Sequence, residues 1–175
     1  MFATIYLPNF YLQAAIRHQP ELREKPVALI EEQEKKPVII QLNEAAEEAG
    51  IRKGMTPSQA LARYLQVTIK ARGRTQEKSI QEILLHYAFT LSPFVEATEP
   101  GICTIQFTDN RVLSAKVSRV IEQLAECEIT AQAGIAPAPD TSLLIAHLAG
   151  PVLEINDAKE FLAPLPIETL AMIGT

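Results

Sequence analysis

Tryptophan is absent from this 175-residue sequence, cysteine occurs only twice, and no run approaches the roughly 20 apolar residues of a membrane span. Cys103 and Cys127 are far apart and form no CxxC pair, which argues against a disulfide framework and a zinc site. We expect both to be small core residues. The start, MFATIYLPNF, has neither the basic region nor the cleavage site of a signal peptide. We therefore expect a cytoplasmic protein with no membrane segment.

An excess of positive charge is also missing. The chain has 16 Lys and Arg against 21 Asp and Glu, which gives a net charge of −5. Domains that bind DNA strongly by themselves are usually basic. We therefore expect weak or no DNA binding by this chain, with Lys70, Arg72 and Arg74 as the candidate contacts to a DNA backbone. The alternative is that these three residues form a solvated strand edge that protects the sheet.

Apolar runs separated by turn residues predict an α+β fold. The order outside residues 26–75 is strand and helix before the gap, then helix, strand, strand, helix and strand after it. This order predicts a ferredoxin-like βαββαβ sheet with a small α/β subdomain inserted into it. The predicted strands are 2–7, 27–31, 37–42, 66–71, 94–97, 102–108 and 129–136, and the longer predicted helices are 10–18, 76–91, 113–127 and 141–149.

Local signals predict where several helices begin and end. Thr56 followed by Pro57 is typical of a helix start, because proline at the first helical position loses no hydrogen bond. Gly50 is expected to end the helix that begins at NEAA, in a left-handed conformation. Asp140 or Thr141 is expected to cap the helix 141–149. Asp157, with Glu160 three residues later, predicts a capping box for a last short helix.

Four segments carry a resemblance to a known family. They are FYLQAAIRHQPELREKPVALI, NEAAEEAGIRKGMTPSQALARY, ITAQAGIAPAPDTSLLIAHLAGP and LAPLPIETLAMIGT. They resemble the palm, fingers and first thumb residues of the Y-family, UmuC-like DNA polymerases of translesion synthesis, and the third fits without a gap. The resemblance implies a palm formed by 1–25 and 76–155, fingers at 26–75, and a truncated thumb at 156–175.

The metal-binding carboxylates of that family are missing at the matching positions. Y-family polymerases hold two cations with carboxylates on the first palm strand and on the central hairpin. Residues 1–20 contain neither Asp nor Glu, and Tyr6 stands at the first position. Gly101 and Ile102 stand where the family has its second acidic pair. The resemblance therefore predicts no bound metal, no cofactor and no catalytic residue.

The positions that contact the triphosphate in the family have also changed. Asn43 and Ala46 stand where the fingers of active members carry a tyrosine and an arginine, and Pro139 stands where the palm carries a lysine. Without the arginine and the lysine, the site lacks the positive charge needed to bind a triphosphate. We therefore predict that the chain is not an enzyme. The predicted vestigial nucleotide site comprises Tyr6, Phe10, Tyr11, Asn43, Ala46, Gly101, Ile102 and Pro139.

One feature of an active site is retained at Tyr11. It matches the bulky steric-gate residue with which the family excludes ribonucleotides. The alternative is that Tyr11, beside Phe10, only fills the core, because aromatic side chains mostly pack.

Loss of the acids in an otherwise retained fold resembles the ImuB-type branch of the family. That branch is implicated in damage-induced (SOS) mutagenesis and DNA repair. The resemblance implies a pseudoenzyme that acts as an adaptor, with a sliding clamp, an error-prone polymerase and a RecA-like accessory protein as partners.

Two other hypotheses stay open. In the first, the chain is a divergent active translesion polymerase whose metal ligands are Glu96, Glu99 or Asp109. In the second, it is an unrelated ferredoxin-like interaction domain, and its strand order or inserted segment will not match a polymerase.

Overall fold

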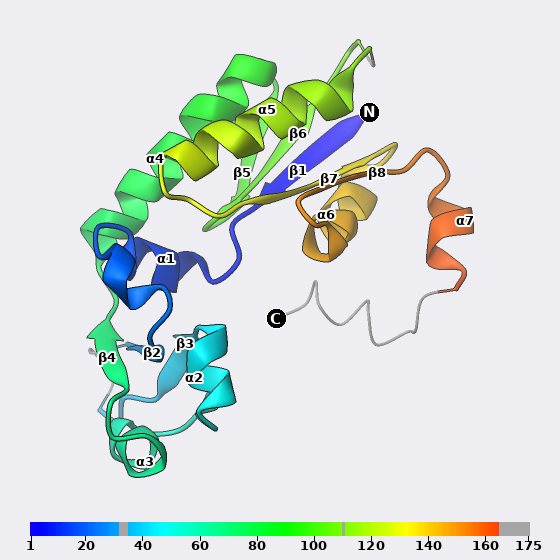
Figure 1. Ribbon diagram of the computed structural model, residues 1–175. Helices are drawn as coiled ribbons and strands as arrows, with labels where there is room; N and C mark the ends of the chain where they lie inside the picture. The colour runs from blue at the N-terminus through cyan, green and yellow to red at the C-terminus, as the bar shows by residue number, and fades with distance from the viewer. Residues whose placement is uncertain (32–34, 110, 165–175) are drawn as a thin grey trace. The chain divides into compact units, whose positions relative to one another are not determined.

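The computed structural model describes residues 1–31, 35–109 and 111–164, and these residues form two compact units (Figure 1). Unit 1 contains Met1–Pro8 and the described residues from Gln81 onward, and unit 2 contains Asn9–Ile80. The second boundary falls inside the helix α4 (Arg74–Leu91). None of the described helices is both long and apolar enough to cross a membrane.

A five-stranded sheet forms the centre of unit 1, in the order β5-β6-β1-β7-β8. The first strand of the chain lies in its middle, antiparallel to β6 and β7. The first four strands of that order are those of a βαββαβ ferredoxin-like sheet, as predicted. The edge strand β8, parallel to β7, was not predicted. The strands are β1 (Phe2–Tyr6), β5 (Val95–Glu99), β6 (Ile102–Gln106), β7 (Gln132–Ala136) and β8 (Val152–Glu154).

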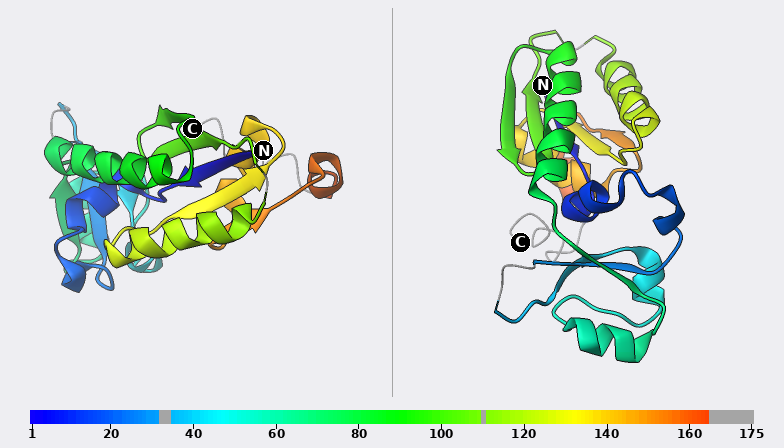
Figure 2. Two further views of the ribbon diagram at one scale, coloured as in Figure 1. Left: turned by 90° about the horizontal axis from the view of Figure 1, so that it is seen from above. Right: turned by 90° about the vertical axis from the view of Figure 1, so that its left-hand side faces the viewer.

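Helices cover both faces of this sheet. α4 and α5 (Leu113–Glu126) lie on one face, and α6 (Pro139–Leu148) lies on the other (Figures 1 and 2). Alternation along β1 explains the two layers, because successive side chains point to opposite faces. Ala3 and Ile5 are fully buried. Thr4, also fully buried, exchanges a 2.7 Å hydrogen bond with the Ser142 hydroxyl of α6.

The predicted start of α6 is wrong. The helix begins at Pro139, after Ala138, which makes no side-chain cap hydrogen bond. Proline at the first helical position has its φ set for a helix and lacks only an N–H that would be unpaired there, so it defines the start instead of Asp140 or Thr141. At α7 (Ala158–Leu162), Asp157 does cap the helix by accepting from the N–H groups of Lys159 and Glu160. Of the predicted thumb, 156–175, the residues after 164 lie outside the part of the chain that the structure describes.

Unit 2 has a three-stranded sheet in the order β3-β2-β4, with β2 antiparallel to β3 and parallel to β4. Its capping signals were predicted correctly. Thr56 and Gln59 form a capping box, and Gly50 has φ +82°. The elements are α1 (Phe10–Ile16), η1 (Pro20–Leu22), β2 (Val27–Ile30), β3 (Ile39–Leu42), α2 (Glu44–Glu48), α3 (Pro57–Arg63) and β4 (Thr68–Ala71).

The boundaries of the units differ from those predicted for palm and fingers. The helix α1 was expected in the palm segment 1–25, but it belongs to unit 2, where it contacts β2 and β3. Leu12 and Ile16 pack with Leu22, Val27 and Leu29. The backbone N–H of Leu12 also donates to Gln41 Oε1 over 2.9 Å.

The two cysteines differ in burial. Cys103 on β6 is fully buried, as predicted for a core residue, and burial raises the pKa of its thiol to about 12. Cys127 is only half-buried and lies 3.5 Å from the hydroxyl of Tyr87.

Candidate active site

The end of β1 is the place where the resemblance puts the first metal-binding carboxylate. Tyr6 occupies it, paired with Ile102 on β6 and with Gln132 on β7. The Tyr6 ring stacks on the imidazole of His147 in the last turn of α6, with ring centroids 4.0 Å apart and planes inclined by 38°. Partial burial raises the pKa of Tyr6, so its phenol stays neutral near physiological pH.

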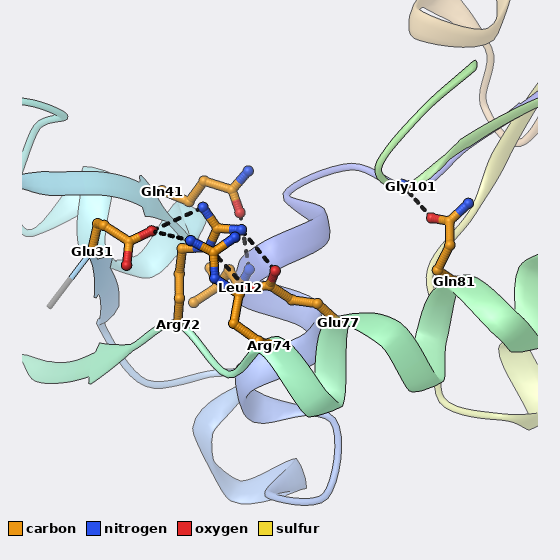
Figure 3. Close-up of polar contacts among 8 residues, drawn as sticks. All are labelled: Leu12, Glu31, Gln41, Arg72, Arg74, Glu77, Gln81 and Gly101. Carbon is orange, nitrogen blue, oxygen red and sulfur yellow. Dashed lines mark hydrogen bonds and ion pairs between the residues drawn. The ribbon is translucent and has the colours of Figure 1, made fainter. Parts of the chain in front are cut away.

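The hairpin beside Tyr6 is closed by a glycine that the backbone requires. Gly101 has φ +79°, a conformation that an aspartate adopts only with strain. Its N–H donates to Gln81 Oε1 over 2.7 Å (Figure 3), and its carbonyl accepts from the N–H of Leu7 over 2.9 Å. Ile102, the next residue, is buried. The geometry of this turn therefore disfavours an acidic pair at 101 and 102.

The three candidate acids occupy different surroundings. Glu99 is exposed and pairs in the sheet with Ile102, one strand away from Tyr6. Glu96 pairs with Thr104 and lines a cavity of about 290 Å³, together with Phe2 and Pro139. Asp109 forms an exposed ion pair with Arg111. Glu99 is therefore the one of the three acids that lies at the Tyr6 end of the sheet.

These residues do not fit a pair of divalent cations. Hard cations of this kind need several oxygen ligands each. Nowhere in the described part of the chain do three or more His, Cys, Asp or Glu side chains gather closely enough to hold a metal ion.

His147 makes the stability of unit 1 depend on pH. Burial lowers the pKa of His147 below its ordinary 6.5, and the carboxylate of Glu99 partly opposes the shift. Because folding favours the neutral imidazole, its contribution to the free energy of unfolding should be fully present above pH 6.5 and lost as the pH falls through the lowered pKa. Urea midpoints measured on both sides of pH 6.5 test this.

The matched variant is His147→Phe, which keeps an aromatic ring against Tyr6 but does not titrate. Its urea midpoint should fall less than that of the wild type on acidification. Equal pH dependence in the two proteins would show that His147 is not the titrating group.

In unit 2, Tyr11 lies in a network of charges that the sequence did not reveal. The guanidinium of Arg72 lies 3.8 Å from the centroid of the Tyr11 ring. The same guanidinium donates to Glu31 over 3.0 Å and to Glu77 over 2.7 Å (Figure 3). The hydrogen bond to Glu77 is the largest of the effects that raise the pKa of Arg72 above its ordinary value. Phe10, in edge contact with Tyr11, is buried.

This network separates the three candidate DNA contacts. The side chain of Arg72 is only 14% exposed and has two carboxylate partners. Arg74, at 64% exposure, shares Glu31 with it over 3.2 Å. Lys70 lies half-buried on β4, an edge strand of its sheet. The charge of Arg72 is thus neutralised within unit 2, and contact with DNA stays a prediction for Lys70 and Arg74.

The residues at the predicted triphosphate positions have clear structural roles. Asn43 caps α2 by accepting from the N–H of Ala46, and it also accepts from the N–H of Val27 over 3.0 Å. Its amide donates to the carbonyls of Arg23 and Lys25. Ala46 is fully buried. In unit 1, the carbonyl of Pro139 accepts from the hydroxyl of Ser142 over 2.7 Å.

Sequence reasoning missed His147, Gln81 and the carboxylates of Glu31 and Glu77. His147 had one signal, because it lies in the gap-free block that ends at Pro151. The other three are ordinary polar residues, Glu31 at the end of a predicted strand and Glu77 and Gln81 in a predicted helix, and only their contacts in the folded chain give them a role.

Comparison with known proteins identifies the family. The model of the impB/mucB/samB family matches residues 5–147. A protein of Shewanella halifaxensis named DNA polymerase IV is 29% identical over 94% of this chain and 49% of its own length. One of the same name from Citrobacter koseri is 27% identical over 94% of this chain and 50% of its own. The chain thus spans about half the length of these curated relatives.

Solved structures share the fold. A post-insertion binary complex of Dbh DNA polymerase superposes with a TM-score of 0.84, at 17% identity, over 96% of this chain and 52% of that one. DinB from Sulfolobus solfataricus gives a TM-score of 0.81, at 16% identity, over 96% of this chain and 52% of that one. An unrelated interaction domain would not match in this way, and that hypothesis is wrong.

The prediction that the chain is not an enzyme is contradicted by these comparisons. The relatives that match 94% of the chain are named DNA polymerase IV, and the fold is that of Dbh DNA polymerase. The prediction relied on a few aligned positions, whereas a catalytic group can also come from a neighbouring strand of the same sheet.

The family match over residues 5–147 and the shared strand order confirm the resemblance found in the sequence, and this chain belongs to the impB/mucB/samB family of UmuC-like, Y-family DNA polymerases.

Proposed function

We propose that this chain forms the palm and fingers of a divergent DNA polymerase that acts on primer–template DNA in DNA repair and translesion synthesis. The observation that supports this most is the family match over residues 5–147, which covers most of both units. On this proposal, unit 1 is the palm and unit 2, from Asn9 to Ile80, is the fingers.

Glu99 is the carboxylate that the geometry supports as part of the reaction. It is exposed, it belongs to the hairpin that follows α4, and its strand neighbour Ile102 pairs with Tyr6. His147, which stacks on Tyr6, is close enough for Glu99 to act on its pKa. An exposed carboxylate beside a neutral imidazole can accept a proton from a primer hydroxyl.

The proposal predicts template-directed extension of a primer by the protein at its full length. The assay supplies dNTPs and magnesium or manganese, on an undamaged template and on one with an abasic site. Extension on both templates is the expected result. The proposal would be overturned if no extension occurred on either template, whether magnesium or manganese was supplied.

Glu99→Gln is the informative variant. Loss of a proton acceptor should lower the extension rate by about 100-fold, with primer–template binding retained. Glu96→Gln and Asp109→Asn are the controls, because they remove the same charge at sites away from Tyr6. A rate for Glu99→Gln equal to those of both controls would exclude Glu99 as the acting carboxylate.

The protein partners are part of the same proposal. By family resemblance they are a sliding clamp, an error-prone polymerase and a RecA-like accessory protein, and purified candidates can be tested by co-elution in gel filtration. A cytoplasmic location accords with this role.

A further inference from the structure

A groove of about 540 Å³ lies between α4 and α5 in unit 1. The two helices lie next to each other on one face of the sheet, the face opposite α6 (Figures 1 and 2). The groove is lined by one stripe of residues on each helix. These are His86, Tyr87, Thr90 and Leu91 on α4, and Lys116, Arg119, Val120 and Gln123 on α5. The residues proposed to act in the reaction do not contribute to the lining of the groove.

The groove is positive although the chain is negative. Lys116 and Arg119 line it one turn apart on α5, and none of the described lining residues is acidic. Both cations are exposed, and within the described parts of the chain neither has an ion-pair partner. In a protein with a net charge of −5, two unpaired cations beside one hollow create a local field for an anionic partner.

The lining of the groove is partly apolar. Leu91 and Tyr87 from α4 and Val120 from α5 are among its lining residues. The hydroxyl of Tyr87 lies 3.5 Å from the sulfur of Cys127 at the end of α5, which holds the ring in place. Thr90 and Gln123 add hydrogen-bonding groups to the lining. An occupant that gains from this surface carries apolar side chains as well as negative charge.

We propose that this groove binds a short acidic peptide segment of a partner protein, with an aromatic or aliphatic side chain placed between its carboxylates. A nucleic acid fits the groove less well. Lys116 and Arg119 offer only two phosphate contacts, and exposed Glu122 and Glu126 on the same helix would repel a longer phosphate backbone.

Fluorescence anisotropy tests the proposal on the 175-residue chain. The probe is a short fluorescein-labelled peptide with glutamates on both sides of a Leu-Phe pair, and single-stranded DNA labelled in the same way is the competing probe. We expect micromolar binding of the peptide that weakens with added salt, and clearly weaker binding of the DNA. No binding of the peptide, or DNA binding that charge reversal at Lys116 and Arg119 weakens more than it weakens peptide binding, would overturn the proposal.

Charge reversal locates the binding site. The double variant Lys116→Glu with Arg119→Glu should weaken peptide binding by at least about tenfold. The control is Arg63→Glu with Lys159→Glu, which changes the net charge by the same amount at exposed positions outside the groove. If both double variants weakened peptide binding equally, the change in net charge alone would explain the loss. The groove would then not be the binding site.

A second measurement needs no variant, so misfolding of a variant cannot affect it. In the wild-type chain labelled with nitrogen-15, the peptide should shift amide resonances of residues 86–91 and 116–123. Shifts confined to other residues would place the peptide elsewhere and overturn the proposal.

Discussion

Gly134→Ala should lower the free energy of unfolding of the chain by about 3 to 5 kcal/mol, or prevent folding. Gly134 is the middle residue of β7, directly beneath α6. A Cβ at this position would collide with the backbone nitrogen of Ala146 and the carbonyl oxygen of Ser142, and would lie 2.7 Å from the carbonyl carbon of Ile145. Backbone atoms cannot rotate away, so α6 would have to move off the sheet.

The control for this prediction is Gly73→Ala. A Cβ at Gly73 would also meet an obstacle, but the obstacle is the end of the Gln76 side chain, which can adopt another rotamer. The free energy of unfolding should then change by less than about 1 kcal/mol. Urea denaturation of both variants gives the comparison. Similar losses in the two would show that close approach of α6 to β7 is not what Gly134 provides.

Arg72→Ala should destabilise the chain by about 3 kcal/mol, because it leaves two carboxylates without their shared cation. The side chains of Glu31 and Glu77 are only 17% and 9% exposed. The guanidinium also covers the ring of Tyr11, so its removal costs packing as well as charge. Urea or thermal unfolding followed by circular dichroism measures the loss.

Arg74→Ala is the matched control, since it removes an arginine that contacts the same Glu31. Its side chain is 64% exposed, and exposed ion pairs contribute about 1 kcal/mol or less. We expect Arg74→Ala to be nearly neutral. A loss for Arg72→Ala no larger than that for Arg74→Ala would mean that the network does not stabilise unit 2.

Local order along the chain was predictable because it follows from nearby residues. The runs FATIYL and VALI are β-prone and apolar, and each forms a strand within a residue or two of its predicted bounds. Thr56 with Pro57 sets the start of α3 by contacts within one turn. The short strand β8 was missed because its three residues follow Gly150-Pro151, a turn signal, and become a strand only by pairing with β7.

The candidate site was predictable only in part, because its contacts join distant segments. The resemblance located Tyr6, Gly101 and Ile102 in one place, and the sheet pairs Tyr6 with Ile102. It did not reveal that His147 stacks on Tyr6, since α6 returns across the sheet after a long interval of sequence. Arg72 was expected at a surface. Two carboxylates enclose it instead: Glu31, which is distant in the sequence, and Glu77, which is close.

The central position of β1 makes the order of synthesis matter. Phe2 leaves the ribosome before either of its sheet partners, Gln106 and Ala136. At the usual pace of translation the second partner follows on the order of ten seconds later. All of unit 2, a continuous segment that ends at Ile80, is complete before either partner strand has been made. During that interval the apolar run FATIYL is an unpaired nascent segment, a ready target for chaperones that shield newly made strands.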